Sequence, residues 1–450
     1  MLFGSLNAIF VINVQEESRM FYDLKQNLTK LEINRPELDF ERCLSVWSTS
    51  RNLRFPMSTF GLLAATMSWQ TASAQTFTKA SSDNLQTICN TGSTLSGSQL
   101  ESICNDLNLG GGAAANTASS GVGTQSQPAS LLISQQLKKD AQTKQERHDR
   151  PKSGSADAIA ANWGNFSTFL TAGATDLRHR NNEFEQGYNA TIPSVTLGGG
   201  YSISKSLEAG LAFNYSNSNA DFNTGGGFNV DSYSPILYIN YQPFDNAFAS
   251  LALGYTRQNQ TNNRLAVAGV NGTTGNVISG FTAGKLSANQ YTLNFLSGYD
   301  HPIDTFTIGP RVGVDVRQWE MDSYQESSNT GLELSYNSQY QTSIQSTLGL
   351  AASSAHRLKY GVLVPQLSAS WVHEYANNSR TINSHFVQAT NSAPNFQFQT
   401  ENPAQDWAVI NLGASFVMQR DVQVFANFLT VQGNRNFESY GGNLGVKFGW

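Results

Sequence analysis

Apolar and polar side chains alternate along the sequence from Trp163 to the C-terminus. Val312, Val314 and Val316, for example, alternate with glycine and charged residues. A period of two is the pattern of a β-strand that has one apolar and one polar face. The pattern recurs in twelve segments, which we predict to be strands. They span 163–173, 188–203, 206–217, 230–242, 246–258, 287–300, 305–320, 332–352, 359–375, 406–418, 421–431 and 438–450.

The connections between these strands alternate in length. Those after even-numbered strands are short, whereas Asn259–Leu286 and Ala376–Gln405 each span about thirty residues. Short turns on one side and long loops on the other are typical of an outer-membrane β-barrel. Only 14% of the residues are charged, 11% are aromatic, and the mean hydropathy is −0.33, which fits this class. We therefore predict an all-β, 12-stranded antiparallel transmembrane β-barrel. The net charge of −5 argues against a nucleic-acid partner.

The region before the barrel contains an export signal. Arg51 and Arg54 precede an apolar core at 57–69, and a small-x-small site ends at Ala74. We predict a signal peptide over 51–74, cleaved between Ala74 and Gln75, within an extended or mis-started N-terminus of residues 1–74. The alternative is a buried helix in a small N-terminal domain.

Two similar segments, LQTICN and LESICN, lie fifteen residues apart after this signal. Their leucine and isoleucine are three residues apart, as on one face of a helix, and Ser82 and Ser98 are suited to cap the two helices, with Gly92 ending the first. An even number of cysteines in an exported chain favours a disulfide, so we predict a helical hairpin linked by Cys89 and Cys104. No histidine or third cysteine lies nearby to complete a metal site.

A flexible linker is predicted at 110–130, because this stretch is rich in glycine, alanine and serine. The linker and the helical hairpin together make a short exported segment, 75–130. The following residues, 131–149, are strong helix formers with many charges and no glycine or proline. From composition alone, this helix is expected to be solvated.

Three blocks in the barrel region carry a family resemblance: YGVLVPQLSASWVHEY at 360–375, TIGPRVGVDV at 307–316 followed by SYQE, and the last strand, 441–450. Residues 161–450 resemble the translocator β-domain of autotransporters, which belong to type V secretion. The resemblance implies that residues 131–160 form a linker helix inside the barrel lumen. It also implies contacts between two sets of charged residues, although the barrel set would equally suit an open, water-filled pore. The helix set is Lys138, Lys139, Asp140, Lys144, Glu146 and Arg147, and the barrel set is Arg311, Asp315, Arg317, Glu374 and Lys447.

The last strand has the pattern that barrel-assembly machinery recognises. Leu444, Val446, Phe448 and Trp450 alternate with small or polar residues, and the strand ends in an aromatic. We expect the partners to be outer-membrane lipid, the barrel-assembly machinery and periplasmic chaperones. The expected location is the outer membrane of a Gram-negative bacterium, with loops exposed at the cell surface.

The sequence departs from the family before the barrel. The exported segment is short. Self-cleaving members of the family cut the lumenal helix by attack of an asparagine side chain, and no asparagine lies between Lys138 and Ala161. We therefore predict that the barrel translocates or displays a short, uncleaved N-terminal segment. The alternative is a stand-alone porin, or an adhesin that acts through its long surface loops.

The sequence contains no catalytic constellation. A Gly-x-Ser-x-Gly or Gly-Asp-Ser nucleophile is absent, His373-Glu374 lacks the second histidine of a zinc protease, and His385 is isolated in a long loop. The sequence thus predicts no enzyme, cofactor or metal, and an outer-membrane hydrolase is the least favoured alternative.

Overall fold

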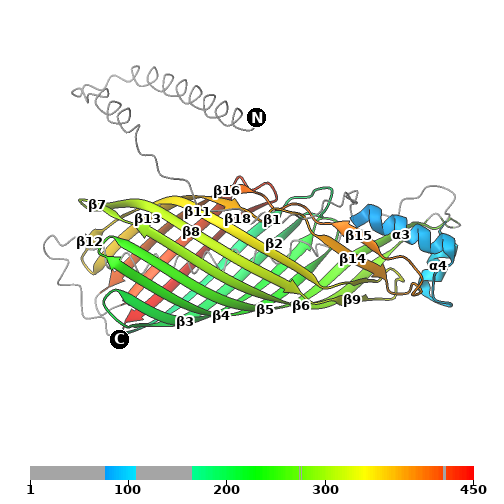
Figure 1. Ribbon diagram of the computed structural model, residues 1–450, viewed down its shortest axis with the longest axis horizontal. Helices are drawn as coiled ribbons and strands as arrows, with labels where there is room; N and C mark the ends of the chain where they lie inside the picture. Colours follow the sequence, from blue (N-terminus) through cyan, green and yellow to red (C-terminus); the bar gives the residue numbers. More distant parts are fainter. Residues whose placement is uncertain (1–76, 108–164, 273, 275, 419–421, 450) are drawn as a thin grey trace, which may run out of the picture. The chain divides into compact units, whose positions relative to one another are not determined.

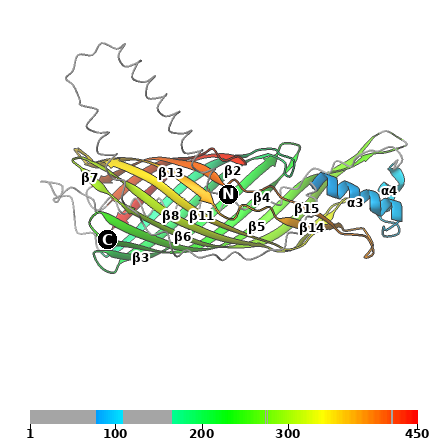
Figure 2. The ribbon, with the colours of Figure 1, turned by 45° about the horizontal axis from the view of Figure 1, so that its top comes forward.

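The computed structural model describes residues 77–107, 165–272, 274, 276–418 and 422–449. The chain divides into two compact units, Met1–Thr71 and Ala72–Trp450, and every described residue belongs to the second. Two helices, α3 (Phe77–Thr91) and α4 (Gln99–Asp106), precede a closed antiparallel barrel (Figures 1 and 2). None of the helices among the described residues is long and apolar enough to cross a membrane.

The predicted twelve-stranded barrel is confirmed. Among the described residues, twelve long strands each pair antiparallel with the next, and the first pairs with the last, so that Ala172 lies opposite Leu444. The wall strands are β1 (Phe166–His179), β2 (Tyr188–Ser202), β3 (Leu207–Phe222), β4 (Gly226–Phe244), β5 (Ala247–Val270), β6 (Val277–Tyr299), β8 (Phe306–Met321), β11 (Gln339–Ser354), β13 (Gly361–Glu374), β16 (Asp406–Met418), β17 (Val422–Gln432) and β18 (Phe437–Gly449).

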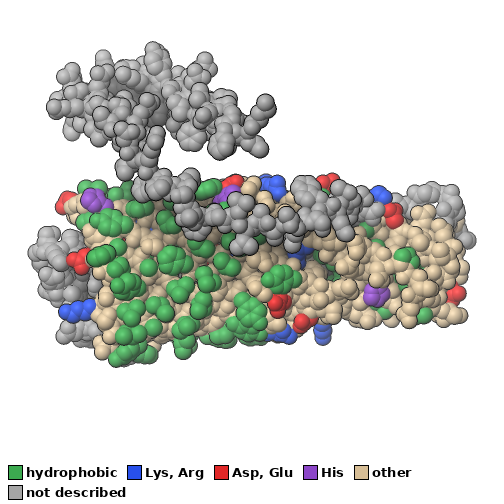
Figure 3. Space-filling view, viewed as in Figure 1, with side chains coloured by type: hydrophobic (Ala, Val, Ile, Leu, Met, Phe, Trp, Pro, Cys, Tyr) green, Lys and Arg blue, Asp and Glu red, His purple; other side chains and the backbone are tan. Residues whose placement is uncertain are grey.

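The two faces of the wall follow the predicted alternation. Val312 and Val314 are exposed on the outside, whereas Arg311 and Asp315 on the same strand are buried on the inside. Figure 3 shows hydrophobic side chains gathered over the part of the wall near β7 and β12, and few of them toward the end that carries α3 and α4. On the face that this figure shows, the surface suited to contact with lipid is therefore concentrated on that part of the wall.

Exposed aromatic side chains border this apolar band on both sides. Tyr233 and Tyr291 belong to the belt on the long-loop side, and Tyr241 and Tyr299 to the belt on the short-turn side. The members of each pair are eight residues apart, which corresponds to about 27 Å along a strand. With a strand tilt of about 35–45°, this gives a height of roughly 19–22 Å, somewhat less than the apolar band of about 25 Å typical of an outer membrane.

The strands β5 and β6 continue far beyond the aromatic belt on the long-loop side, which we call the outer belt. β5 ends at Val270, fifteen residues after Tyr255, and β6 begins at Val277. The predicted long loop Asn259–Leu286 is therefore wrong, because most of it is a paired hairpin. The segment is rich in asparagine and threonine, which suggested a loop. Pairing satisfies its backbone groups, and its inward side chains, such as Gln260 and Asn262, are buried and bond to each other at 2.7 Å.

Short strands add to the rims of the barrel. The predicted loop 376–405 contains β14 (Thr381–Phe386) and β15 (Phe396–Gln399), which pair with each other. The predicted strand 332–352 is divided, since β10 (Leu334–Tyr336) leaves the wall to pair with β14 and with β9 (Tyr324–Ser327). On the short-turn side, β7 (His301–Ile303) and β12 (His356–Leu358) extend two hairpins.

Candidate functional site

The helices α3 and α4 form a hairpin that is linked by a disulfide. Cys89 and Cys104 are bonded, with their Cα atoms 5.0 Å apart, which confirms the predicted pair. Ser98 caps α4, as predicted, and its hydroxyl accepts a hydrogen bond from the amide of Glu101 at 3.2 Å. A disulfide thus links the two helices, and a side-chain cap satisfies the start of the second.

The end of α3 also follows the prediction, but its start does not. Gly92 has a φ of +68°, and across it the amide of Ser93 donates to the carbonyl of Ile88 at 3.1 Å, the usual way for a helix to end at glycine. The predicted cap at Ser82 is wrong, because α3 begins at Phe77 and Ser82 lies inside it.

The apolar face of the hairpin packs onto the extended ends of the barrel strands. The ring of Phe77 lies edge-on to that of Phe398 at 4.8 Å, and 6.3 Å from that of Phe396. Leu100 is 0% exposed. The hairpin and the barrel rim therefore share one core. Its hairpin members are Phe77, Ala80, Leu85, Ile88, Leu100 and Ile103, and its rim members include Ala266, Ala268, Leu286, Trp319, Leu332, Leu334, Tyr336, Ile382 and Phe386.

The connection between the helices pairs with the backbone of the loop between β14 and β15. The amide of Leu95 donates to the carbonyl of Gln388 at 3.0 Å, and the amide of Thr390 donates to that of Ser93 at 2.9 Å. The side-chain oxygen of Gln388 accepts from the amide of Leu100 at 3.1 Å, at the free start of α4. These bonds set the position of the hairpin along the rim.

The C-terminal end of the hairpin is bound to the tip of the β5–β6 hairpin. The amide of Gly272 donates to the carbonyl of Asp106 at 2.8 Å, and Leu107 forms a β-bridge with Asn271. The last described residue before the undescribed segment 108–164 therefore lies at the far end of the longest wall strands.

Close approach of α4 to the rim requires a glycine at position 331. Gly331 has a φ of +75°, and a Cβ atom there would lie 2.8 Å from the amide nitrogen of Leu100. Both the backbone conformation and the lack of space exclude a larger residue without displacement of the helix.

A buried ion pair lies beneath α3. The guanidinium of Arg264 contacts both carboxylate oxygens of Glu326, with Nε 2.8 Å from Oε1, and lies 5.9 Å from the ring centre of Phe77. The amide of Leu334 also donates to this carboxylate, at 3.0 Å. Burial acts to lower the pKa of Arg264, but the charge and hydrogen bonds of Glu326, together with Tyr336 and Tyr324, outweigh it and raise that pKa. The guanidinium of Arg264 therefore stays charged under the hairpin.

The barrel residues predicted to face a lumenal helix lie on the inward face and are buried, as the alternation required. Arg311 forms an ion pair with Asp300, and Arg317 with Asp315, so the wall itself supplies partners for these charges.

Glu374 also has partners in the wall. Its Oε1 accepts from the amides of Ile344 and Ala376 at 2.9 and 3.0 Å, and its Oε2 from the Ser343 hydroxyl at 2.6 Å and from the Gln345 amide group at 3.0 Å. Contacts of these residues, and of the buried Lys447, with the predicted helix remain predictions. Lys138, Lys139, Asp140, Lys144, Glu146 and Arg147 lie outside the described residues.

Other predicted residues lie outside the described part as well: the signal at 51–74 with its cleavage site at Ala74 and Gln75, the linker 110–130 and Trp450. In the final strand, Leu444 and Phe448 are exposed on the lipid face, and Val446 shares that face.

Sequence reasoning missed the binding surface for the hairpin. Gln388, Gly331 and the pair Arg264–Glu326 each lie more than 150 residues from the helices along the chain. One feature of the sequence indicates an apolar surface there. The alternation of β5 continues through Arg264 to Ala268, and its inward residues change from polar ones to alanine.

The closed twelve-stranded wall and its lipid-facing band define an outer-membrane β-barrel. A family model described as the autotransporter beta-domain matches residues 168–428, which is 261 of the 450 residues. The chain belongs to this family, and its barrel lies in the outer membrane of a Gram-negative bacterium.

Three solved autotransporter structures are similar to this chain, and the first of them shows the same fold. The translocator domain of the autotransporter NalP from Neisseria meningitidis is 16% identical, with a TM-score of 0.50, and the match covers 71% of this chain and 98% of that one. The β-domain of the Bordetella autotransporter BrkA is 12% identical (TM-score 0.44; 64% and 100% covered). The transport unit of AIDA-I from Escherichia coli is 13% identical (TM-score 0.42; 68% and 97% covered). No curated protein matches the sequence.

Proposed function

We propose that this barrel translocates its own short N-terminal segment and displays it, uncleaved, at the cell surface. The observation that carries the proposal is the position of the two ends of segment 108–164. Leu107 lies at the tip of the β5–β6 hairpin, beyond the aromatic belt on the long-loop side. In contrast, β1 begins at Phe166, opposite the exposed Tyr201 near the end of β2, on the short-turn side.

The chain between these two ends has to cross the membrane. Outside the wall it would have to pass through lipid, and this segment contains Lys138, Lys139, Asp140 and Lys144. Each charge costs about 2.5–3.5 kcal/mol at the centre of a bilayer even in a helix. The lumen offers a polar route instead, and we propose that residues 131–160 occupy it as a helix.

The burial of the inward side chains supports a filled lumen. Polar residues on the inner face, such as Thr196, Asn214, Ser415 and Gln423, are buried, although a twelve-stranded wall is wider than the eight-stranded barrels that side chains alone can fill. In this proposal Arg311, Asp315, Arg317, Glu374 and Lys447 contact Lys138, Lys139, Asp140 and Lys144 in addition to their partners in the wall.

The docked hairpin supports retention of the displayed segment. Its apolar residues are buried in the core that the hairpin shares with the barrel rim. Released from the rim, the hairpin would expose Phe77, Leu85, Ile88 and Leu100 to water. We propose that the segment acts as a fixed cap over the mouth of the barrel.

An epitope inserted after Ser96, in the exposed turn of the hairpin, tests surface display. Antibody should label intact cells, and the labelled chain should stay with the outer membrane. The matched control is the same epitope between Ser204 and Lys205, in an exposed short turn, which should react only after the outer membrane is made permeable. Lack of labelling at Ser96 on intact cells, or an epitope found in the medium, would contradict the proposal.

Conductance separates this function from that of an open porin. Deleting residues 131–160 should raise the single-channel conductance of the refolded protein, because the lumen would lose its proposed plug. Equal conductance with and without these residues would favour the porin.

Assembly partners follow from the final strand. We propose that Leu444, Val446, Phe448 and Trp450 form the signal that the barrel-assembly machinery reads, after export by the signal at 51–74 with cleavage between Ala74 and Gln75. Periplasmic chaperones would hold the unfolded chain, which exposes this apolar face before insertion.

A further inference from the structure

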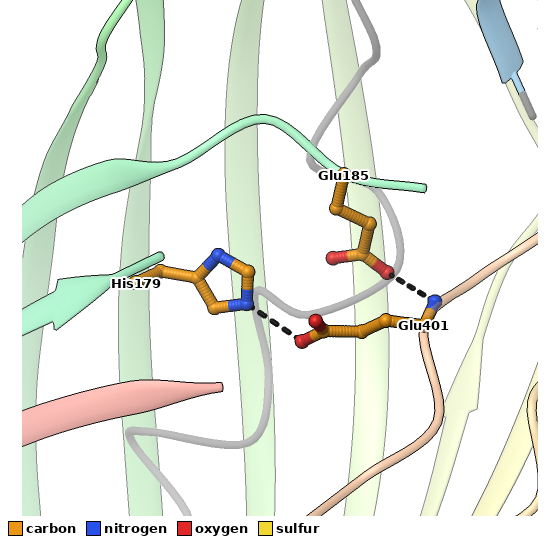
Figure 4. Close-up of side chains that lie close together, drawn as sticks. All are labelled: His179, Glu185 and Glu401. Atoms are coloured by element: carbon orange, nitrogen blue, oxygen red, sulfur yellow. Dashed lines mark hydrogen bonds and ion pairs between the residues drawn. The ribbon is translucent and has the colours of Figure 1, made fainter. Parts of the chain in front are cut away.

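Three side chains from two distant parts of the sequence meet at the extracellular rim, where β1 ends. His179 is the last residue of β1, Glu185 lies in the connection to β2, and Glu401 lies between β15 and β16 (Figure 4). One donor atom from each residue lies within 4.8 Å of the other two. In the part of the chain that the structure describes, this is the only such group of three or more His, Cys, Asp or Glu residues.

Neighbouring groups hold these side chains in place. The His179 ring stacks on that of Tyr188, with centres 5.0 Å apart and planes 5° apart. The side-chain amide of Asn182 donates to Glu401, and its oxygen accepts from the amide of Glu185 at 2.9 Å. The amide of Glu401 in turn donates to the carboxylate of Glu185 at 3.3 Å. Such outer partners orient the ligands of metal sites in proteins.

The charges in the cluster favour a cation. His179 and Glu185 are buried, and 10% of the Glu401 side chain is exposed. Both His179 and Arg380 interact with Glu185 through charge. Two carboxylates beside one imidazole in a buried place attract positive charge, which a bound divalent ion would supply.

We propose that His179, Glu185 and Glu401 bind a divalent transition metal of the Zn²⁺ class, with water completing the coordination. One imidazole nitrogen and two carboxylate oxygens are ligands that suit Zn²⁺. Bonds of 2.0–2.2 Å in a tetrahedron place donor atoms about 3.4 Å apart. His179 Nε2 and Glu401 Oε1 are now 2.7 Å apart, and no pair of donors exceeds 4.8 Å. Binding therefore requires side-chain shifts of about 1 Å.

The metal would link two loops across the seam that closes the barrel, which is the pairing of β1 with β18. In the wall, β17 and β18 separate β16 from β1. The loop that carries Glu401 crosses over their connection, where the Asn436 side chain donates to the carbonyl of Asn402 at 2.9 Å. The same loop carries Phe396 and Phe398, which contact Phe77 of the docked hairpin. Metal binding would thus stabilise both the seam and the surface on which the hairpin docks.

The test is titration of the full-length folded protein, without a histidine tag, with ZnCl₂ by calorimetry and with CoCl₂ by visible absorption. We expect one ion per chain. The substitutions His179→Ala and Glu401→Gln should each weaken binding at least about 100-fold, since even loss of an outer partner costs 10–100-fold. The matched control is His373→Ala, which removes an imidazole paired with Asp406 at 2.8 Å elsewhere on the wall and should leave binding unchanged.

Heat-modifiable migration on gels confirms that each variant has a folded barrel. If His179→Ala fails to fold, Glu185→Gln and Glu401→Gln keep the shape of the side chains and serve in its place. A folded wild-type protein that binds neither Zn²⁺ nor Co²⁺ would overturn the proposal, and the cluster would then hold only a proton. Equal affinity in the wild type and in the Glu185→Gln/Glu401→Gln variant would also overturn it, because the metal would then lie elsewhere.

Discussion

Replacing Leu100 by alanine tests whether the hairpin docks through the core it shares with the barrel. Leu100 is 0% exposed and lies in that core. Removing its side chain beyond Cβ costs about 2–5 kcal/mol at such a site. The wall closes without Leu100, so we expect the loss to fall on the docked state of the hairpin. The undocked population should then rise roughly 30-fold at the lower value and a few thousand-fold at the upper one.

Hydrogen exchange read by mass spectrometry measures this population in the folded protein. Amides of residues 85–104 should exchange faster in Leu100→Ala, whereas those of the wall strands should keep their protection. Leu95→Ala is the matched control, because its side chain lies in the same hairpin but is 48% exposed, and its backbone bond to Gln388 is unaffected.

Two results would refute this reasoning. Equal exchange in the Leu100→Ala and Leu95→Ala proteins would mean that the shared core does not hold the hairpin. A similar loss of protection throughout the wall would mean that the hairpin is not a separate cooperative unit of the structure.

Three further predictions concern the wall, the disulfide and the ion pair. Val314→Arg places a charge on the lipid face and should lower the free energy of unfolding in lipid by about 2–4 kcal/mol; Asn263→Arg, exposed beyond the outer belt, should change it little, and equal values would contradict the assigned face. Replacing Cys89 and Cys104 by serine should destabilise the docked hairpin by roughly 3 kcal/mol, and a thiol reagent should label neither cysteine in the unreduced parent. Arg264→Met leaves the Glu326 carboxylate buried without its cation. The free energy of opening of α3, measured by hydrogen exchange, should therefore fall by about 3–5 kcal/mol; exchange like that of the parent would show that the pair is dispensable.

Much of the barrel could be predicted from local patterns. Alternation of side chains identifies strands because successive residues point to opposite faces, and both faces of β8 follow it, from Val312 outside to Asp315 inside. The disulfide was also predictable, because Cys89 and Cys104 occupy the same place in two similar helical segments.

Composition misled where tertiary pairing overrides local preference. The polar stretch 259–286 has the residues of a loop, yet it forms the ends of β5 and β6. Strand propensity depends on the partner strand and on what covers the face, and neither is encoded within the segment itself.

What the sequence determined by itself is the class of the protein, because periodicity, loop alternation and the cysteine pair are relations between residues close in the chain. The tertiary structure alone decided where the hairpin docks and which side chains surround it. Leu100 meets Gln388, Arg264 meets Glu326 and His179 meets Glu401 at separations of 62 to 288 residues. Such contacts arise only when the barrel closes and brings the ends of its strands to one rim, so no local pattern predicts them.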